Sequence, residues 1–153
     1  MKLRTILCSI AMMTSLSMLS CNDDMSPKSV PADVREAFYT MYPNSRILEC
    51  EREDGMWVLE FKNNGSESEA WFDGNQWVMT ETDISYRALP QAVKNAFAVS
   101  RYADWKREDV DMVERRGYET VYVIEVERGE DEADLYFTES GLLVRENLEK
   151  DHD

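Results

Sequence analysis

The chain has 153 residues, with 17 Lys and Arg residues against 31 Asp and Glu residues, and a formal net charge of −14. Hydrophobic residues make up 43% and charged residues 31%, a globular composition that excludes a disordered chain. The acidic excess, without a dense Lys or Arg stripe, excludes a surface that follows a nucleic acid backbone. The only histidine is His152, at the end of the chain, which excludes Ser-His-Asp, Cys-His and multi-histidine zinc sites.

Residues 1–20 have the features of a secretory signal peptide. Lys2 and Arg4 form a short positive start, and the apolar stretch at residues 6–13 contains no acidic residue. A membrane-spanning helix needs roughly 20 apolar residues, and Thr and Ser residues interrupt this stretch too early for that. We therefore expect residues 1–20 to be absent from the mature fold.

A lipidation site follows the signal. The sequence Met-Leu-Ser-Cys at residues 18–21 resembles a bacterial lipoprotein cleavage box, in which a small residue precedes the cysteine that is lipidated. This resemblance implies that Cys21 carries the lipid and that the protein contacts the membrane only through that anchor, as an outer-membrane lipoprotein of the cell envelope. Asn-Asp-Asp at residues 22–24 resembles the export signal of Bacteroidetes surface lipoproteins, so both the periplasmic side and the cell surface remain open. The polar residues 21–29 are expected to form a flexible tether.

Cysteine usage indicates a fold without disulfides. Cys8 would leave with the signal and Cys21 would carry the lipid, which leaves Cys50 alone. Cys50 is in phase with Leu48 on a predicted strand, and we interpret it as a small buried hydrophobic residue rather than a reactive thiol. The domain must therefore be stabilised by its core.

Two segments of the chain share one helix-forming pattern. Residues 30–38 and 89–97 coincide at an offset of 59, and both have the form apolar-Pro-x-x-Val-x-x-Ala-Phe. Pro is favourable at the start of a helix, and the spacing of Val, Ala and Phe makes one apolar stripe. The pattern predicts helices at residues 31–41 and 90–101.

Four strand-like segments with turn-forming residues between them follow each predicted helix. Residues 30–86 and residues 87–153 therefore each predict a helix followed by a four-stranded antiparallel meander. Halves of about 55 to 60 residues would be marginally stable alone. We expect an α+β fold in which the two sheets of this tandem repeat either join or pack into one eight-stranded unit, with both helices on one side of the sheet.

The second half carries a family resemblance. Tyr-Glu-Thr-Val-Tyr-Val-Ile-Glu-Val at residues 118–126, followed by the acidic-aromatic strand and turn glycine of residues 133–143, resembles the PepSY-like pattern. The tandem arrangement over residues 30–148 is similar to the beta-lactamase-inhibitor-like, PepSY-like lipoproteins of Bacteroides and relatives. The resemblance implies a protein that binds other proteins, in particular secreted hydrolases, through the open face of its sheet.

Alternation within the strands sorts the side chains onto two faces. Around residues 69–73 and 134–138 one phase is apolar in both halves, and the other phase carries Trp71 and Tyr136. The same alternation places Met79 and Val144 on the core side. The outward phase predicts a solvent-facing, partner-binding surface with two aromatic anchors, which comprises Trp71, Tyr136, Val58, Glu60, Val78, Val123, Glu125 and Leu143. The alternative is that the two aromatic rings cover backbone or pack between the halves.

No catalytic or metal-binding pattern is found in the sequence. The acidic run at residues 130–134 lacks the Asp-x-Asp-x-Asp-Gly spacing of a calcium loop, so we interpret it as solvated charge. No pair of carboxylates can be singled out as a glycosidase pair. We expect no metal, no cofactor and no enzymatic activity.

The leading functional hypothesis is a lipid-anchored, non-catalytic envelope protein. It would bind, and in that way could inhibit, another envelope or secreted protein such as a hydrolase. The acidic residues around the predicted partner-binding surface would favour a basic partner. The alternative is a surface glycan-binding or accessory lipoprotein.

Overall fold

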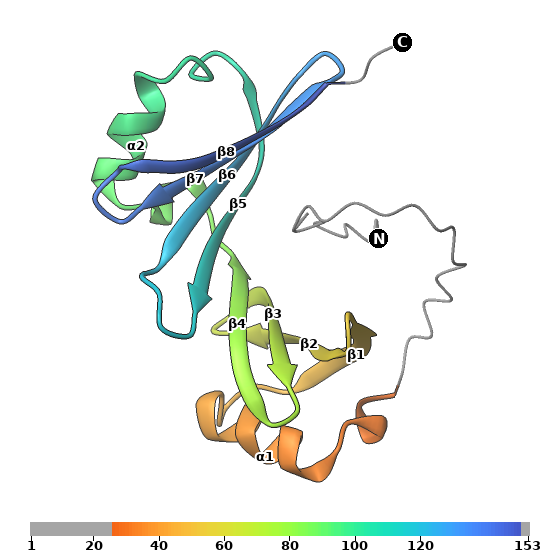
Figure 1. Cartoon of the computed structure of the whole chain (residues 1–153). Helices are drawn as coiled ribbons and strands as arrows, with labels where there is room; N and C mark the ends of the chain where they lie inside the picture. Colours follow the sequence, from red (N-terminus) through yellow and green to blue (C-terminus); the bar gives the residue numbers. More distant parts are fainter. Residues whose placement is uncertain (1–25, 151–153) are drawn as a thin grey trace.

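The computed structural model describes residues 26–150, which form an α+β domain with two α-helices and one eight-stranded antiparallel sheet (Figure 1). The predicted signal peptide and Cys21 lie outside the described residues. In chain order the elements are the short 3-10 helix η1 (Pro27–Ser29), α1 (Ala32–Met41), β1 (Ile47–Glu53), β2 (Met56–Asn63), β3 (Ser66–Asp73), β4 (Gln76–Asp83), the 3-10 helix η2 (Tyr86–Ala88), α2 (Gln91–Ala98), β5 (Lys106–Arg115), β6 (Val121–Arg128), β7 (Asp131–Thr138) and β8 (Leu143–Lys150).

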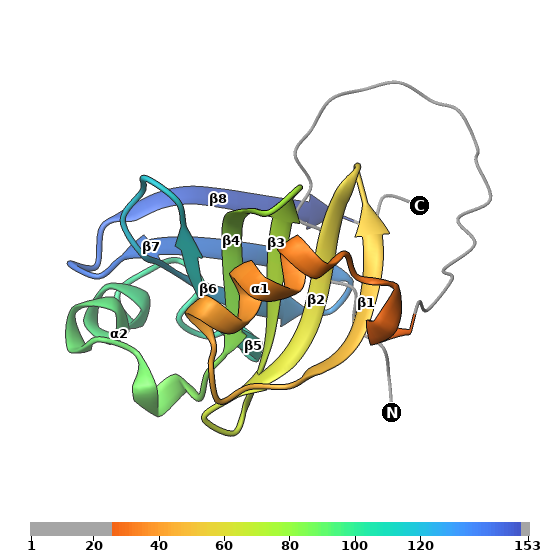
Figure 2. The same cartoon turned by 90° about the horizontal axis from the view of Figure 1, so that it is seen from below.

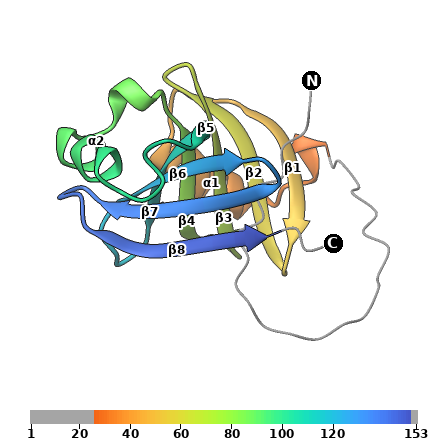
Figure 3. The same cartoon turned by 90° about the horizontal axis from the view of Figure 1, so that it is seen from above.

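The strands pair in chain order from β1 to β8, each antiparallel to its neighbours. The prediction of two helices and eight antiparallel strands is therefore confirmed, and of the two expected arrangements the structure has the one in which the two sheets join. Figures 2 and 3 show that α1 lies over β2 to β4 and that α2 lies beside the half of the sheet formed by β5 to β8. No helix among residues 26–150 is long and apolar enough to cross a membrane.

Both helices begin directly after a proline. The carbonyl oxygens of Pro31 and Pro90 accept backbone hydrogen bonds from Arg35 and Lys94, at 3.0 and 3.1 Å. Proline suits this position because its fixed φ, −52° in both cases, leads into the first turn and its missing N–H is not needed there. The helix α2 ends at Ala98, three residues before the predicted end, because the chain turns at residues 99–101.

Each helix packs its apolar stripe on its own half of the sheet. The first cluster joins Val34 and Phe38 of α1 to sheet residues that include Phe61, whose ring meets that of Phe38 edge to face at 4.9 Å. The second cluster joins Val93 and Phe97 of α2 to an equivalent set of sheet residues. These sheet sets are Ile47, Cys50, Leu59, Phe61, Ala70 and Phe72 in the first cluster, and Val110, Ile124, Val126, Ala133, Leu135 and Phe137 in the second.

One row of paired residues runs across six strands and connects the two clusters. It passes from β2 to β7 through Phe61, Ser68, Thr82, Met112, Tyr122 and Phe137. Residues directly opposite each other in an antiparallel sheet point to the same face. The row therefore places the sheet residues of both clusters on one face, which we call the core face.

Two bulges change which side chains reach the core face at the end of each half. In β4 the register passes from Trp71↔Met79 to Phe72↔Trp77, so Val78 is the extra residue. The sequence prediction put Met79 on the core side, and this is wrong because a bulge reverses the alternation beyond it. Met79 instead shares a face with Trp71.

The same correction applies to β8. Its register passes from Tyr136↔Arg145 to Phe137↔Leu143, so Val144 is the extra residue. Leu143, predicted on the partner-binding surface, is paired with the core-face residue Phe137 instead. The two bulges lie at equivalent places in the two halves, which is why the prediction fails in both strands in the same way.

The end of the predicted tether is part of the fold. Pro27–Ser29 forms η1 beside β1, and Val30 is buried in the first cluster. The thiol of Cys50 donates a hydrogen bond to the carbonyl oxygen of Ser26, with a distance of 3.4 Å between the sulfur and the oxygen. Residues 26–29 of the predicted tether are therefore part of the fold, and Cys50 is a buried residue of the core face, as predicted.

Gly141, in the turn between β7 and β8, allows a close approach to α2. A Cβ atom on Gly141 would lie 2.6 Å from the carbonyl oxygen of Ala92, whereas a Cβ on Gly74 would have no atom within 4 Å. Both glycines have positive φ, so both alanine variants are strained. We expect Gly74→Ala to lower the free energy of unfolding by about 1 kcal/mol and Gly141→Ala by about 3 kcal/mol, as measured by denaturant unfolding. Equal losses of unfolding free energy in the two variants would show that the turn does not approach α2 closely.

Candidate functional site

The face of the sheet opposite the core face carries most of the predicted partner-binding residues, and it is rich in carboxylates. We call it the acidic face. On β2 and β3, Val58 is paired with Trp71 and Glu60 with Glu69. On β6 and β7, Val123 is paired with Tyr136 and Glu125 with Asp134. The structure therefore brings the predicted residues together as two groups of adjacent pairs, one in each half.

The apolar residues of this face are not exposed, and in this respect the sequence prediction is wrong. Trp71 is 8% exposed, and Val58 and Val123 are buried as well. The indole Nε1 of Trp71 donates a hydrogen bond of 3.0 Å to Oε2 of Glu53 from the edge strand β1, so a polar neighbour lies against the ring. The sheet also bends between its two halves (Figure 1).

Tyr136, the second predicted anchor, is half-buried. The guanidinium of Arg145 lies over its ring, 5.3 Å from the centroid. Arg145 reaches this face because the bulge at Val144 turns it there. On this face the buried apolar side chains therefore lie beside the charged ones, as neighbouring pairs along the same strands.

Four glutamates from four strands stand directly opposite one another on this face. The register pairs Glu49 with Glu60, Glu60 with Glu69, and Glu69 with Glu81, across β1 to β4. We call this row the glutamate ladder. Like charges directly opposite in an antiparallel sheet destabilise the pairing. The ladder therefore costs stability rather than adding it.

The pKa values of the ladder carboxylates report this crowding. Loss of hydration, followed by the charge of Glu60, raises the pKa of Glu69 from 4.5 to about 7. Loss of hydration, followed by the charges of Glu69 and Asp134, raises the pKa of Glu81 from 4.5 to about 7. Asp134 belongs to β7 and Glu81 to β4, so the carboxylates of the two halves influence one another across the bend.

Asp111 of β5 continues the carboxylate cluster beyond the ladder. It is buried and paired in register with Asp83 of β4. Burial, followed by the charges of Glu81 and Asp83, raises the pKa of Asp111 from 3.8 to about 8. Sequence analysis did not single out Glu81 or Asp111. Within residues 26–150 no group of three His, Cys, Asp or Glu side chains is arranged to hold a metal ion.

The raised pKa values predict that stability falls as the pH rises. A carboxyl group whose pKa is higher in the folded state than in the unfolded state binds protons more strongly when the protein is folded. This proton binding stabilises the fold at low pH, and the stabilisation is lost as the pH rises through the pKa of the folded state. We expect the melting temperature to decrease from about pH 5 to about pH 8. The triple variant Glu69→Gln, Glu81→Gln and Asp111→Asn should show a flatter profile, measured by calorimetry.

A control variant separates this effect from net charge. Glu119→Gln, Glu130→Gln and Glu139→Gln remove three charges from exposed positions in or beside the turns. This variant should keep the pH dependence of the unchanged protein. A melting temperature that is constant or that increases over the same range would contradict the electrostatic description of the acidic face.

Because Trp71 is buried, we expect its replacement to destabilise the fold. Trp71→Ala removes a large buried side chain and leaves Glu53 without the indole donor, and we expect it to lower the free energy of unfolding by about 3 kcal/mol. Tyr118→Ala, at an exposed aromatic residue, should cost less than about 0.5 kcal/mol. Denaturant unfolding measures both. Equal stability of the two variants would show that Trp71 is exposed in solution.

Comparison with known proteins places this fold in a family. The family model described as "Putative beta-lactamase-inhibitor-like, PepSY-like" matches residues 18–67 and 58–145. A search of curated proteins found no match.

Several solved structures are similar over most of their length. A BLIP-like protein from Bacteroides fragilis is 36% identical with a TM-score of 0.74, over 80% of this chain and 89% of that one. A DUF2874 family protein from Bacteroides ovatus is 33% identical with a TM-score of 0.74, over 77% of this chain and 86% of that one. A protein from Bacteroides eggerthii, described as a "putative periplasmic protein", is 28% identical with a TM-score of 0.73, over 77% of this chain and 88% of that one. The chain belongs to the beta-lactamase-inhibitor-like, PepSY-like family.

Proposed function

We propose that this protein is a non-catalytic envelope protein that binds another protein through its acidic face. The observation that carries the proposal is the glutamate ladder, in which like charges stand opposite one another next to buried apolar side chains of the same face. A partner that brings Lys or Arg side chains to the ladder would neutralise this repulsion when it binds. The BLIP-like fold supports protein binding as the mode of action.

The partner that fits this face has a basic surface. Complementary charge speeds association and disfavours acidic proteins, including other copies of this one. Within the predicted surface, Glu60, Glu125 and the half-buried Tyr136 are the proposed contacts. Trp71, Val58 and Val123 are buried beside them on the same face. Val78 and Leu143 are left out of the proposed contact surface because of the bulges.

The arrangement of the helices leaves this face available. We infer that both helices cover the core face and that the two halves are copies of one unit. The continuous row from Phe61 to Phe137 supports the first inference. The equivalent bulges at Val78 and Val144 and the equivalent helix starts at Pro31 and Pro90 support the second.

Attachment to the cell envelope is part of the proposal. The cleavage box at residues 18–21 supports cleavage before Cys21, with residues 1–20 as the signal peptide and Cys21 as the lipidated residue. The Bacteroides eggerthii relative, described as a "putative periplasmic protein", supports an envelope location. Mass spectrometry of the mature N-terminus tests it. An unmodified N-terminus would remove the lipid anchor from the proposal.

A glycan-binding role has less support. Sugar recognition commonly uses an exposed aromatic ring as a stacking surface, and the ring of Trp71 is covered. We therefore propose protein binding alone.

The ladder predicts an unusual combination of stability and binding. The variant Glu60→Gln, Glu69→Gln and Glu81→Gln should unfold at a higher temperature than the unchanged protein, because it removes repulsion. It should also bind its partner at least about tenfold more weakly, because it removes the attraction. The partner is first identified by crosslinking the lipidated protein in its own envelope, and its affinity is then measured by calorimetry at several salt concentrations.

The control is the variant with Glu119→Gln, Glu130→Gln and Glu139→Gln, which has the same net charge. It should bind within about twofold of the unchanged protein, and the affinity of the unchanged protein should fall with added salt. Equal binding by the two triple variants would show that the acidic face is not the interface.

A further inference from the structure

The polar side chains buried in this fold are hydrogen-bonded, with one exception. Among residues 26–150 the buried polar residues are Ser68, Thr80, Thr82, Asp111 and Thr138. The hydroxyl groups of this set are all bonded to other side chains, at distances between 2.7 and 3.0 Å. Asp111 is 6% exposed, and within the described residues its carboxyl group accepts no hydrogen bond and forms no ion pair.

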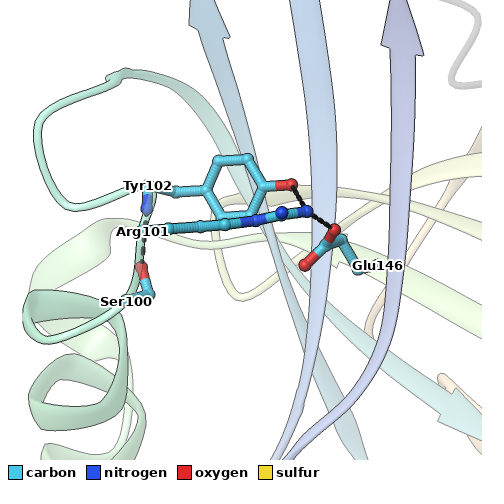
Figure 4. A network of polar contacts seen from close by, with 4 residues as sticks. All are labelled: Ser100, Arg101, Tyr102 and Glu146. Atoms are coloured by element: carbon cyan, nitrogen blue, oxygen red, sulfur yellow. Dashed lines mark hydrogen bonds and ion pairs between the residues drawn. The ribbon is translucent and has the colours of Figure 1, made fainter.

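Elsewhere the chain supplies the partner that a buried polar group needs (Figure 4). Tyr102 is buried, and its hydroxyl accepts a hydrogen bond of 2.8 Å from Nη2 of Arg101, in the loop after α2. Arg101 also forms an ion pair with Glu146 of β8. Leaving a buried polar group without a partner destabilises a fold, so a native protein that keeps such a group needs a reason for it.

Four other carboxylates act on Asp111, which lies on the acidic face where β4 pairs with β5. Asp83 of β4 stands directly opposite it, and Glu81 lies two residues earlier on the same strand. Asp109 is on β5 itself, and Glu125 is on the neighbouring strand β6. Burial, followed by these four charges, raises the pKa of Asp111 to about 8, so the free protein keeps a proton on this carboxyl group at neutral pH.

The arginines of the acidic face are placed beside aromatic rings instead. Arg115 of β5 is paired with Met79, and its guanidinium lies 5.6 Å from the centroid of the Tyr118 ring. Arg145 of β8 also lies over an aromatic ring, as described above. Among the described side chains, therefore, none supplies a positive charge to Asp111.

The carboxyl group of Asp111 is nevertheless accessible from outside. Neither of its oxygens is fully enclosed. A narrow opening of this kind suits a side chain with a slender apolar stem and a charged end, which is the form of Lys and Arg. The surrounding negative charge favours such a cation over any neutral or acidic group.

We propose that Asp111 is the anchor point of the acidic face, where its carboxylate forms an ion pair with one Lys or Arg side chain of the protein partner. This inference rests on the proposed function and adds the position at which the partner is held. The proton that Asp111 carries in the free protein passes to the solvent as the ion pair forms, because the cation stabilises the carboxylate. Affinity should therefore rise with pH, since fewer molecules must then lose a proton before they bind.

The first test needs no partner and uses n-butylammonium, which has the charge and the stem of a lysine side chain. Its binding to the full chain, labelled with carbon-13, is followed by NMR through the side-chain carboxyl resonances of Glu81 and Glu125. Binding at about pH 8.5 should be saturable, and at about pH 6.5 it should be about tenfold weaker. Asp111→Asn should abolish it, whereas Asp33→Asn, at an exposed position of α1, should leave it unchanged.

Two further ligands control this measurement. Neutral n-butanol has the same stem and should not cause these shifts. Calcium chloride at equal ionic strength should not cause them either, and stronger shifts with calcium would indicate a metal site and overturn the proposal. Butylammonium shifts that are absent, or that persist in Asp111→Asn, would also overturn it.

The second test uses the partner identified by crosslinking. Calorimetry in buffers of different ionisation enthalpy counts the protons released on binding. At about pH 7, Asp111→Asn should release about one proton fewer than the unchanged chain and bind about tenfold more weakly. Asp33→Asn should match the unchanged chain in both respects. Asp111→Asn should stay folded, because asparagine replaces a protonated carboxyl group of the same size, and its melting temperature checks this.

The outcomes separate this inference from the proposed function. Full binding and full proton release by Asp111→Asn would overturn the anchor point, and the proposed function would still stand if the Glu60, Glu69 and Glu81 variant bound weakly. Equal binding by that triple variant and its control would refute the proposed function. The butylammonium measurement would then still show whether Asp111 accepts a cation.

Discussion

The pairing of β4 with β5 is the constraint on which the rest of the structure depends. The two apolar clusters lie in separate halves. The backbone pairing of β4 with β5, from Met79↔Arg115 to Asp83↔Asp111, joins those halves into one sheet. On the core face near this seam, Thr82 is hydrogen-bonded to Ser68 at 3.0 Å and is paired with Met112 of β5. The backbone pairing of β4 with β5 therefore sets how the halves meet.

This seam also assembles the acidic face. It places Glu81 of β4 and Asp111 of β5 on the same side of the sheet and close enough for the charge of one to raise the pKa of the other. The buried side chains of Val58, Trp71 and Val123 lie beside these carboxylates on the same face, and the loss of hydration that raises the pKa values of Glu69 and Glu81 also strengthens the repulsion between them. A face built in this way reduces folding stability.

The element order could be predicted from the sequence because it rests on strong local signals. The Pro-x-x-Val-x-x-Ala-Phe pattern defines both helix starts, and turn residues separate strands of regular alternation. The bulges could not be predicted in the same way. Val78 and Val144 are ordinary strand residues, and only the register shows that each is the extra one. A single unpaired residue reverses every assignment beyond it, as Met79 and Leu143 show.

The burial of Trp71 shows a different limit of sequence reasoning. Alternation correctly separates this residue from the helix-facing core, but alternation cannot report how strongly a sheet bends or which neighbour lies over a ring. Acidic residues, by contrast, recur at every second position in several strands, as in Glu49, Glu51 and Glu53 and again in Glu81 and Asp83. Because alternate residues share a face, this period of two already places most of the strand carboxylates on one side. The sequence pattern therefore predicts the charge of this face, whereas it does not predict the burial of its aromatic residues.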